Sequence, residues 1–183
     1  LSITDHDSLS AIDEARQYAE GIELITGVEL SCHYQDADIH LLAYFIDPAY
    51  APLADKVKFY QLERLKRGIL IVEKLNELGI DLKMETVQRV AKDAALGRVH
   101  VADALLKEEY VHTFDEAFSR YLGYHAPAYV PKTHFDPAEA IESHDLVPLR
   151  RLLQMVGGPS VDVVDQIRQR RADFRGQRVQ TQR

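Results

Sequence analysis

The chain opens with Leu1-Ser2-Ile3-Thr4-Asp5-His6-Asp7-Ser8, an apolar and β-branched run that ends in acid, imidazole and acid. This pattern predicts a buried strand that leads into a polar turn. Residues 8–20 then predict a helix, because small and apolar residues recur on one face. In α/β sheets, side chains at the carboxyl end of a strand face the crevice where ligands and metals bind. The polar end of the first strand is therefore a candidate ligand site.

The same residues have a simpler interpretation. Asp7, Ser8 or Ser10 suits the cap of the helix that follows. Asp5 and His6 would then be ordinary turn residues. Because short motifs of this kind often match by chance, the choice between a cap and a ligand site depends on the next two strands.

Two further predicted strands each carry an ionisable residue within a largely apolar run. Residues 22–31 and 39–46 predict these strands, since both are rich in aliphatic residues and are bounded by turn residues. Both faces of each strand are largely apolar, which is typical of parallel or mixed sheets that helices cover. Glu29 interrupts the first of these runs and His40 interrupts the second. Strands and helices together predict an α/β fold.

Glu29 and His40 need a partner if they are buried. A buried carboxylate without one costs several kcal/mol, and a hydrogen-bonded group or a cation is the usual remedy. A hydrogen bond between His40 and Glu29 alone would satisfy both groups. A metal shared with His6 would satisfy them too, and three such residues near the ends of consecutive β elements favour the metal. The sequence therefore predicts a metal site made of His6, Glu29 and His40.

Composition limits the kinds of protein and site that are consistent with the chain. Its 183 residues are 46% hydrophobic and 28% charged, which is typical of a globular protein. No apolar run approaches the ~20 residues of a membrane span, and no signal peptide opens the chain, so we expect no membrane partner. Cys32 is the only cysteine, which excludes a disulfide within the chain and favours a cytoplasmic setting. Eight histidines and 29 acids are compatible with a metal held by His and carboxylate.

Residues from 51 to about 122 have a helical pattern without strand signals. One long apolar stripe ends at Gly79, a suitable C-cap, and shorter helices are predicted at 84–95, 99–108 and 113–122. The stripe consists of Leu62, Leu65, Ile69, Val72, Leu75 and Leu78. A helical block after three β elements predicts an inserted subdomain, which either serves packing alone or covers the site.

The stretch Gly97-Arg98-Val99-His100 opens one of these helices. Free backbone N–H groups at a helix N-terminus favour anions, and the guanidinium group matches the geometry of phosphate oxygens. Arg98 and His100 therefore form a candidate phosphate site. A helix cap with a pair of surface side chains is the alternative for the same residues.

The charge balance changes near the end of the chain. Residues 1–149 contain 14 Lys and Arg against 26 Asp and Glu, whereas residues 150–183 contain 8 against 3. The change marks a boundary, and the Arg- and Gln-rich tail at 150–183 has a composition typical of disorder.

Five short motifs, taken together in their order and spacing, resemble the polymerase and histidinol phosphatase (PHP) family of metal-dependent phosphoesterases. Within that family the similarity is to the branch of 3',5'-nucleoside bisphosphate phosphatases and 5'-3' exoribonucleases. The motifs are Thr4-Asp5-His6-Asp7, Gly27-Val28-Glu29, Asp38-Ile39-His40-Leu41, Gly97-Arg98-Val99-His100 and Tyr129-Val130-Pro131. The resemblance covers roughly residues 1–142. No single motif is decisive, and the specificity comes from the five motifs occurring in this order.

The resemblance implies a role for each candidate at the first site. His6, Glu29 and His40 would bind metal, and Asp5 and Asp7 would support these ligands. The family site holds two or three divalent ions, with manganese expected here and iron, zinc or magnesium as alternatives. Hydrolysis would use a metal-activated water that attacks phosphorus.

The resemblance also implies a substrate and a fold. The substrate would be a nucleotide or a short RNA, whose phosphate Arg98 and His100 would contact. The fold would be an irregular (β/α)7 barrel with a helical insertion. We accordingly expect part of the barrel core at residues 1–48, the insertion at 49–125 and a return towards the barrel at 126–149.

The chain departs from the family pattern at both ends. The family's first strand, with its His-x-His, would precede Leu1. The stretch Ser143-His144-Asp145-Leu146-Val147-Pro148 stands where the family has a Gly-rich turn, a strand and a His-Pro. We therefore expect a partial barrel and an incomplete phosphoesterase that hydrolyses little by itself. Two alternatives remain open, a non-catalytic binding or regulatory module and the PHP domain of a DNA polymerase.

Overall fold

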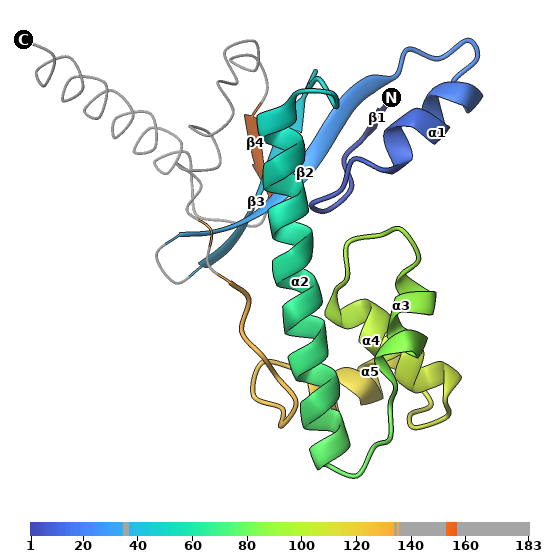
Figure 1. Ribbon diagram of the computed structural model, residues 1–183, viewed down its shortest axis with the longest axis vertical. Helices are drawn as coiled ribbons and strands as arrows, with labels where there is room; N and C mark the ends of the chain where they lie inside the picture. Colours follow the sequence, from blue (N-terminus) through green and yellow to red (C-terminus); the bar gives the residue numbers. More distant parts are fainter. Residues whose placement is uncertain (35–36, 134, 136–152, 157–183) are drawn as a thin grey trace, which may run out of the picture. The chain divides into compact units, whose positions relative to one another are not determined.

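The computed structural model describes residues 1–34, 37–133, 135 and 153–156. Figure 1 shows the helices and strands with the labels used below. The chain divides into two compact units. The first unit contains residues 1–57 and the described residues beyond 133, and the second contains Lys58–Thr133.

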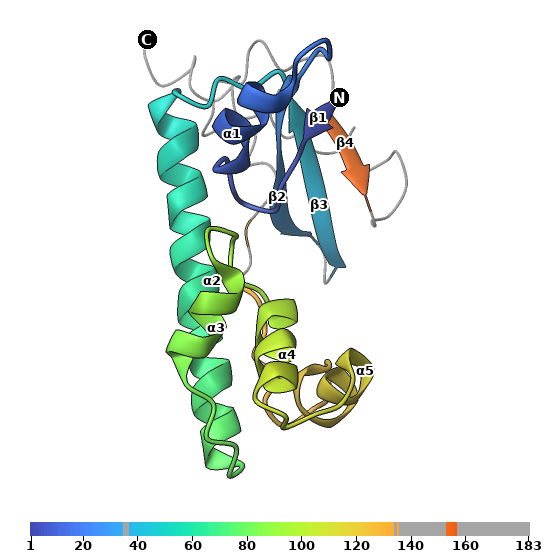
Figure 2. The same ribbon diagram turned by 90° about the vertical axis from the view of Figure 1, so that its right-hand side faces the viewer.

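The first unit is built on a four-stranded mixed sheet. Its strands are β1 (Ser2–Ile3), β2 (Ile25–Tyr34), β3 (Ala37–Tyr44) and β4 (Leu153–Val156), which are hydrogen-bonded in that order across the sheet. Figure 2 shows β4 beside β3. β1 runs parallel to β2, whereas β3 is antiparallel to both β2 and β4. The prediction of an α/β fold is therefore confirmed, and of the two predicted kinds of sheet, parallel or mixed, the sheet is mixed.

β1 and β2 keep one register beyond the end of β1. Ser2 pairs with Ile25 in β1, and four residues further on an isolated parallel bridge joins His6 to Glu29 in the same register. Gly27 makes this pairing sterically feasible, because a Cβ atom there would lie 2.6 Å from the Thr4 side chain. The close approach of the two segments brings the polar end of the first against the middle of β2.

Side chains alternate between the two faces of β2 and β3, so that Glu29 and His40 lie on the face opposite the most deeply buried aliphatic residues. Val28, Leu30, Ile39 and Leu41 are buried, as the period of two predicts. Phe45 stands on the same alternating face in the sequence, but the buried face ends before it. Phe45 has φ 58° and is exposed, because the chain turns there after β3 ends at Tyr44.

The helix after β1 is α1 (Ala11–Tyr18), shorter at both ends than the predicted 8–20. Ser10 occupies the N-cap position without a side-chain cap bond, and the Ser8 hydroxyl accepts the Ser10 N–H at 3.3 Å. The Asp7 carboxylate instead accepts a hydrogen bond from β2. The interpretation of Asp7 as a mere helix cap is therefore wrong.

The longest helix is α2 (Ala51–Glu77), and Gly79 with φ 84° follows its end as predicted. Its predicted apolar stripe is only partly buried. Leu75 and Val72 are buried, whereas Leu62, Ile69 and Leu78 are exposed. The helix carries more apolar residues than one face can bury, so spacing alone did not identify the buried face.

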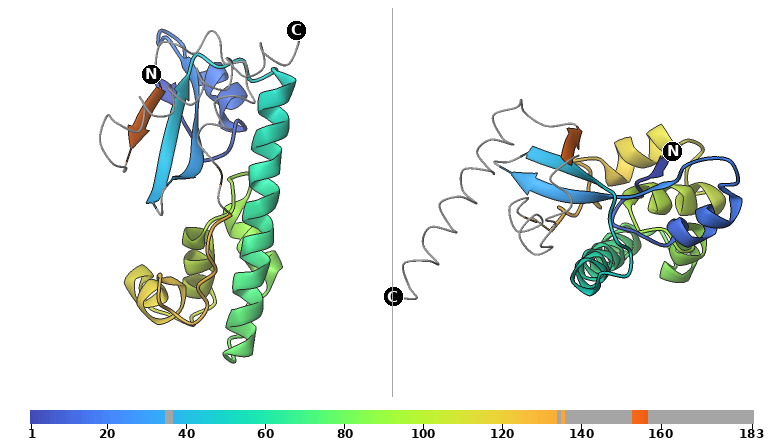
Figure 3. Two further views of the ribbon diagram at one scale, coloured as in Figure 1. Left: turned by 90° about the vertical axis from the view of Figure 1, so that its left-hand side faces the viewer. Right: turned by 90° about the horizontal axis from the view of Figure 1, so that it is seen from above.

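The second unit contains the rest of α2 and the shorter predicted helices (Figure 3). These are α3 (Met84–Ala91), α4 (Arg98–Lys107), α5 (Phe114–Ala117) and the π-helix η1 (Phe118–Leu122). Their shared core is aliphatic. It includes Ile71, Val72, Leu75, Ile80, Leu82, Val87, Leu96, Val101, Leu105, Val111, Leu122 and Val130.

The sequence also predicted a partial barrel, three domain limits and a tail at 150–183. The described residues form an open sheet and no closed barrel. The predicted domain limits at 48, 125 and 149 stay predictions. Leu153–Val156 forms β4 within the predicted tail, and the rest of 150–183 lies outside the described residues. Among the described helices, none combines the length and apolar character needed to cross a membrane.

Candidate metal centre

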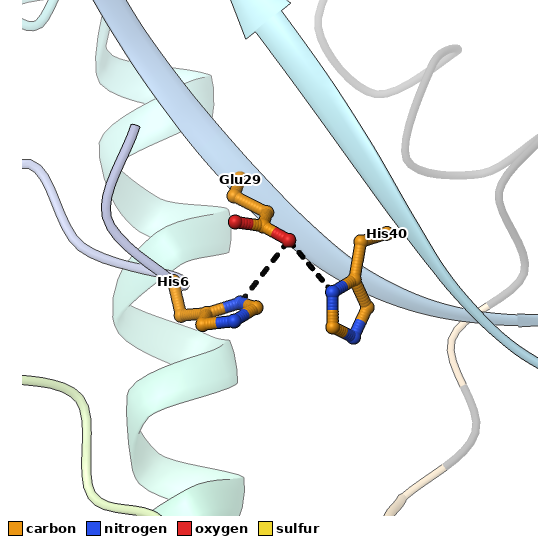
Figure 4. A group of neighbouring side chains, drawn as sticks. All are labelled: His6, Glu29 and His40. Atoms are coloured by element: carbon orange, nitrogen blue, oxygen red, sulfur yellow. Dashed lines mark ion pairs between the residues drawn. The ribbon is translucent and has the colours of Figure 1, made fainter. Parts of the chain in front are cut away.

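Three side chains from neighbouring β segments of the first unit meet at one point (Figure 4). They are His6 after β1, Glu29 in β2 and His40 in β3. One ligand atom from each residue can be chosen so that all three atoms lie within 4.8 Å of one another. The convergence expected from the sequence is found, and the binding of a metal there stays a prediction.

Glu29 is the centre of this cluster. Its Oε1 atom lies 2.6 Å from Nδ1 of His40 and 3.7 Å from Nδ1 of His6. The two imidazole rings are nearly perpendicular, at 87°, with their centroids 4.7 Å apart. The Glu29 side chain is 18% exposed and that of His6 is 47% exposed, so the cluster is anchored inside and open on one side.

The sheet register accounts for the meeting of these residues. Ser31 pairs with His40 across the β2–β3 ladder, and Glu29 pairs with Leu42. Glu29 and His40 are therefore diagonal neighbours on one face, within reach of long side chains. The bridge between His6 and Glu29 supplies the third member from the other side of β2.

Backbone and side-chain hydrogen bonds hold the His6 segment on β2. The Asp7 N–H donates to the Glu29 carbonyl at 2.8 Å, and the Glu29 N–H donates to the Asp5 carbonyl at 3.1 Å. The Asp7 carboxylate accepts the Ser31 N–H at 2.8 Å. Asp7 is 1% exposed, so this bond is shielded from water. Asp7 thus fixes the backbone that follows Glu29, and the Asp5 carbonyl holds the N–H of Glu29 itself.

Two imidazoles and a carboxylate suit a borderline divalent ion. The short contact between His40 and Glu29 allows a second arrangement, in which Nδ1–H of His40 donates to the carboxylate and orients the ring. Histidine ligands in metal sites commonly have such a carboxylate partner on the ring nitrogen that does not bind the metal. Glu29 can therefore act as a ligand or as a positioning residue, and both roles depend on the same geometry.

Arg98 and His100 lie in the second unit, at the first turn of α4. The Arg98 guanidinium donates to the Leu122 carbonyl at 3.0 Å. It also lies over the rings of Phe118 and Tyr129, 5.6 and 5.5 Å from their centroids. Arg98 thus ties α4 to the π-helix, and its contact with a phosphate stays a prediction.

His100 caps its own helix. Its Nδ1 accepts the Gly97 N–H at 3.0 Å, which leaves Nε2 to carry the proton of the neutral ring. Burial lowers the pKa of His100, and the positive charge of Arg64 lowers it further. A neutral His100 can offer an N–H donor to an anion.

Arg64 is a further positively charged residue beside the candidate phosphate site of Arg98 and His100, and the sequence did not reveal it. It lies in α2 and donates to the Leu96 carbonyl at 3.4 Å, beside the start of α4. Its charge acts on His100 because α2 and α4 pack together, and no local motif marks it. Arg64 is far in the sequence from Gly97-Arg98-Val99-His100. A single arginine in a long helix does not form a recognisable motif.

No family model matches the chain. A 5'-3' exoribonuclease of Haemophilus influenzae is 34% identical over 145 residues, which are 78% of this chain and 53% of that protein. The 3',5'-nucleoside bisphosphate phosphatase of Chromobacterium violaceum is 30% identical over 133 residues, 71% of this chain and 47% of that protein. The chain thus spans about half the length of the curated relatives it matches.

The fold has a counterpart among solved structures. A Bifidobacterium adolescentis protein assigned as a metal-dependent phosphoesterase superposes with a TM-score of 0.75, at 24% identity, over 91% of this chain and 62% of that one. This likeness establishes the mixed α/β fold. The sequence relatives are hydrolases of nucleotides and RNA by name. These sequence matches relate the chain, at about 30% identity, to two members of the PHP family of phosphoesterases, a 5'-3' exoribonuclease and a 3',5'-nucleoside bisphosphate phosphatase.

Proposed function

We propose that this chain carries part of a metal-dependent phosphoesterase that hydrolyses phosphate esters of nucleotides or of RNA 5' ends. The observation that supports this most strongly is the meeting of His6, Glu29 and His40 around one point. The names of the relatives support the substrate class, since one acts on RNA and another on nucleoside bisphosphates.

The donor set favours some metals over others. Imidazole suits iron and zinc and carboxylate suits manganese, so a set of two imidazoles and one carboxylate is compatible with all three, whereas magnesium prefers oxygen ligands and retains its water. We propose manganese first, with iron or zinc as alternatives and magnesium ranked last. When bound, the ion would polarise the phosphoryl group and activate water.

The protein's own contribution is position and charge. His6 and His40 would each present one ring nitrogen, and Glu29 would add a negative charge that offsets that of the ion. Asp7 would hold Glu29 in place through its bonds to β2. Asp5 would support the ligands beside it.

We extend this proposal to the barrel fold and to the contacts with the substrate. The open sheet would be one part of the irregular (β/α)7 barrel of the family, with the helical unit as its insertion. Arg98 and His100 would contact the substrate phosphate, Arg98 through its charge and His100 through its Nε2–H. These roles are compatible with the cap bond to Gly97 and the bond to Leu122 that the two side chains already make.

We expect weak hydrolysis from this chain alone. Three ligands suffice for one ion, whereas metal-assisted phosphoryl transfer commonly uses two ions that stabilise the attacking and leaving oxygens. The test measures phosphate release from adenosine 3',5'-bisphosphate and nucleotide release from 5'-phosphorylated RNA, both with manganese. The H. influenzae exoribonuclease serves as the positive control. We expect activity well below that of the relative, and its loss in His40→Ala.

His33→Ala is the matched control for that experiment. His33 lies on β2 outside the cluster, where its Nδ1 is 3.3 Å from an Asp38 oxygen. Activity should survive this change. Activity that is equal in His40→Ala and the unchanged chain would contradict the proposal, and stoichiometric metal without hydrolysis of either substrate would favour a binding module.

A further inference from the structure

An exposed group of aromatic rings lies on the loop after η1, in the second unit. Tyr124 is 71% exposed and His125 is exposed beside it. The Tyr124 ring makes an edge-to-face contact with His125, with centroids 4.8 Å apart, and a tilted contact with Tyr129 at 5.1 Å. We call these three residues the aromatic platform.

One arginine borders the aromatic platform. The Arg98 guanidinium lies 5.5 Å from the centroid of the Tyr129 ring. Nearby in the sequence, Arg120 lies 4.9 Å from the centroid of the Tyr121 ring and is ion-paired with Glu116. Aromatic rings interleaved with arginines are typical of surfaces that bind single-stranded nucleic acid, where bases stack on rings and cations attract the backbone.

The backbone of the platform is held in place before any ligand arrives. The Tyr129 carbonyl accepts a hydrogen bond from Lys74 Nζ at 2.9 Å, and the next carbonyl, that of Val130, accepts one from Arg67 Nε at 2.8 Å. The Ala128 N–H donates to the Tyr121 carbonyl at 3.0 Å. A ligand that stacks there therefore pays little entropy for ordering the loop.

Packing alone accounts poorly for this group. Tyr129 is half-buried and belongs with the loop, so its ring contacts can serve stability. Tyr124 buries little surface and gains only its two ring contacts. A single exposed aromatic needs no explanation. Tyr124 differs because its ring contacts two further rings, one edge-to-face and one tilted, near Arg98, and is still 71% exposed, so that it remains accessible for stacking.

We propose that the aromatic platform, with Tyr124 as its outermost ring, stacks a nucleobase. The base would come from a free nucleotide or from the end of an RNA strand, and both share the same flat heterocycle. That the ligand is a nucleotide or RNA rests on the proposed function. That this surface stacks a flat ring is inferred from the ring geometry and from Arg98. Binding at this surface needs no metal.

The test measures binding to the full chain in EDTA, so that hydrolysis and the metal site play no part. Fluorescence anisotropy follows a labelled, 5'-phosphorylated hexaadenylate. AMP and ribose 5-phosphate serve as competitors, because the second lacks the base. We expect Tyr124→Ala to weaken hexaadenylate binding at least about fivefold, as for the loss of one stacked base. Tyr124→Phe should bind within about twofold of the unchanged chain, because its ring remains.

The controls separate stacking from other effects. Tyr18 is an equally exposed tyrosine in α1 of the first unit, and Tyr18→Ala should bind like the unchanged chain. AMP should compete and ribose 5-phosphate should not. Equal potency of AMP and unlabelled hexaadenylate would assign the platform to a mononucleotide, and tighter hexaadenylate binding to a strand.

Two results would overturn the proposal. One is unchanged hexaadenylate affinity in Tyr124→Ala, and the other is equal competition by AMP and ribose 5-phosphate. If the chain shows no hydrolysis in the manganese assay but binds hexaadenylate in EDTA in a Tyr124-dependent way, the phosphoesterase proposal is rejected and the platform proposal stands. If hydrolysis is present but Tyr124→Ala binds hexaadenylate as the unchanged chain does, the platform proposal is rejected and the phosphoesterase proposal stands.

Discussion

Asp7 combines three features that rarely occur together in one residue. It has φ 47°, a left-handed conformation that non-glycine residues seldom adopt, and it is almost fully buried. Its carboxylate accepts the N–H of Ser31, and its own N–H donates to Glu29. A strained, buried residue of this kind persists where the surrounding structure holds it, often beside a functional site. We infer that Asp7 positions Glu29 for the cluster.

Removing the hydrogen bond from the Ser31 N–H to the Asp7 carboxylate should cause a measurable loss of stability. Asp7→Ala leaves the buried Ser31 N–H without this acceptor, which should lower the free energy of unfolding by about 1–3 kcal/mol. Asp7→Asn keeps an oxygen and should lose less. Urea denaturation of the metal-free chain gives both values. Asp13→Ala is the control, because Asp13 makes only an exposed pair with Arg16, and a loss there as large as in Asp7→Ala would contradict this role.

His100 predicts a pH dependence of stability. Burial and the charge of Arg64 lower its pKa, and protonation would also compete with the Gly97 N–H for Nδ1. The unfolded chain therefore binds this proton more readily than the folded chain. The contribution of His100 to the free energy of unfolding should fall as pH drops below the ordinary histidine pKa of about 6.5, and should level off below the lowered folded pKa.

The measurement is urea denaturation between about pH 5 and pH 7, the range that histidine titration spans. His100→Gln keeps a neutral acceptor at the third helical position and should flatten the slope. His112→Gln, at an exposed position, should leave the slope as it is. Equal slopes in His100→Gln and the unchanged chain would show that His100 is not the titrating group.

Among the elements, the pairing of β1 with β2 decides the site. The register that joins Ser2 to Ile25 also brings His6 opposite Glu29. Gly27 lies between these pairs, and a Cβ there would meet the Ser2 hydroxyl at 2.7 Å and the Ile3 carbonyl at 3.0 Å. The glycine of Gly27-Val28-Glu29 therefore permits the contact on which the cluster depends.

Gly27→Ala tests this element directly. The added methyl group should push β1 away from β2, with a cost of about 1–3 kcal/mol that is typical of overpacking. It should also weaken metal binding, because His6 moves with β1. Gly97→Ala is the control, since a Cβ there meets nothing nearer than 3.6 Å. Wild-type stability and metal affinity in Gly27→Ala would show that the close approach is not required.

The sequence predicted some elements better than others for physical reasons. A strand that alternates or runs apolar is visible locally, so β2, β3 and the polar interruptions at Glu29 and His40 were found. The buried face of α2 was not, because Leu62 and Ile69 fit a helical stripe as well as the residues that are buried. Tertiary packing chose between the two faces.

At the scale of the whole molecule, the chain carries its candidate chemistry in two units. The sheet unit holds the His6, Glu29 and His40 cluster, and the helical unit holds Arg98, His100 and the aromatic platform. The order of short motifs was enough to predict the family. Arg64 and the platform were beyond that prediction, because they depend on which helices and loops pack together.

The claim on which the account depends is that His6, Glu29 and His40 bind one divalent ion together. Isothermal titration calorimetry of manganese and zinc into the metal-free chain tests it most directly, with His33→Ala as the matched control. We predict about one ion per chain, a loss of at least about 10- to 100-fold in affinity for Glu29→Gln and His40→Ala, and no change for His33→Ala. Absence of binding, or affinity that is the same in all four proteins, would contradict it.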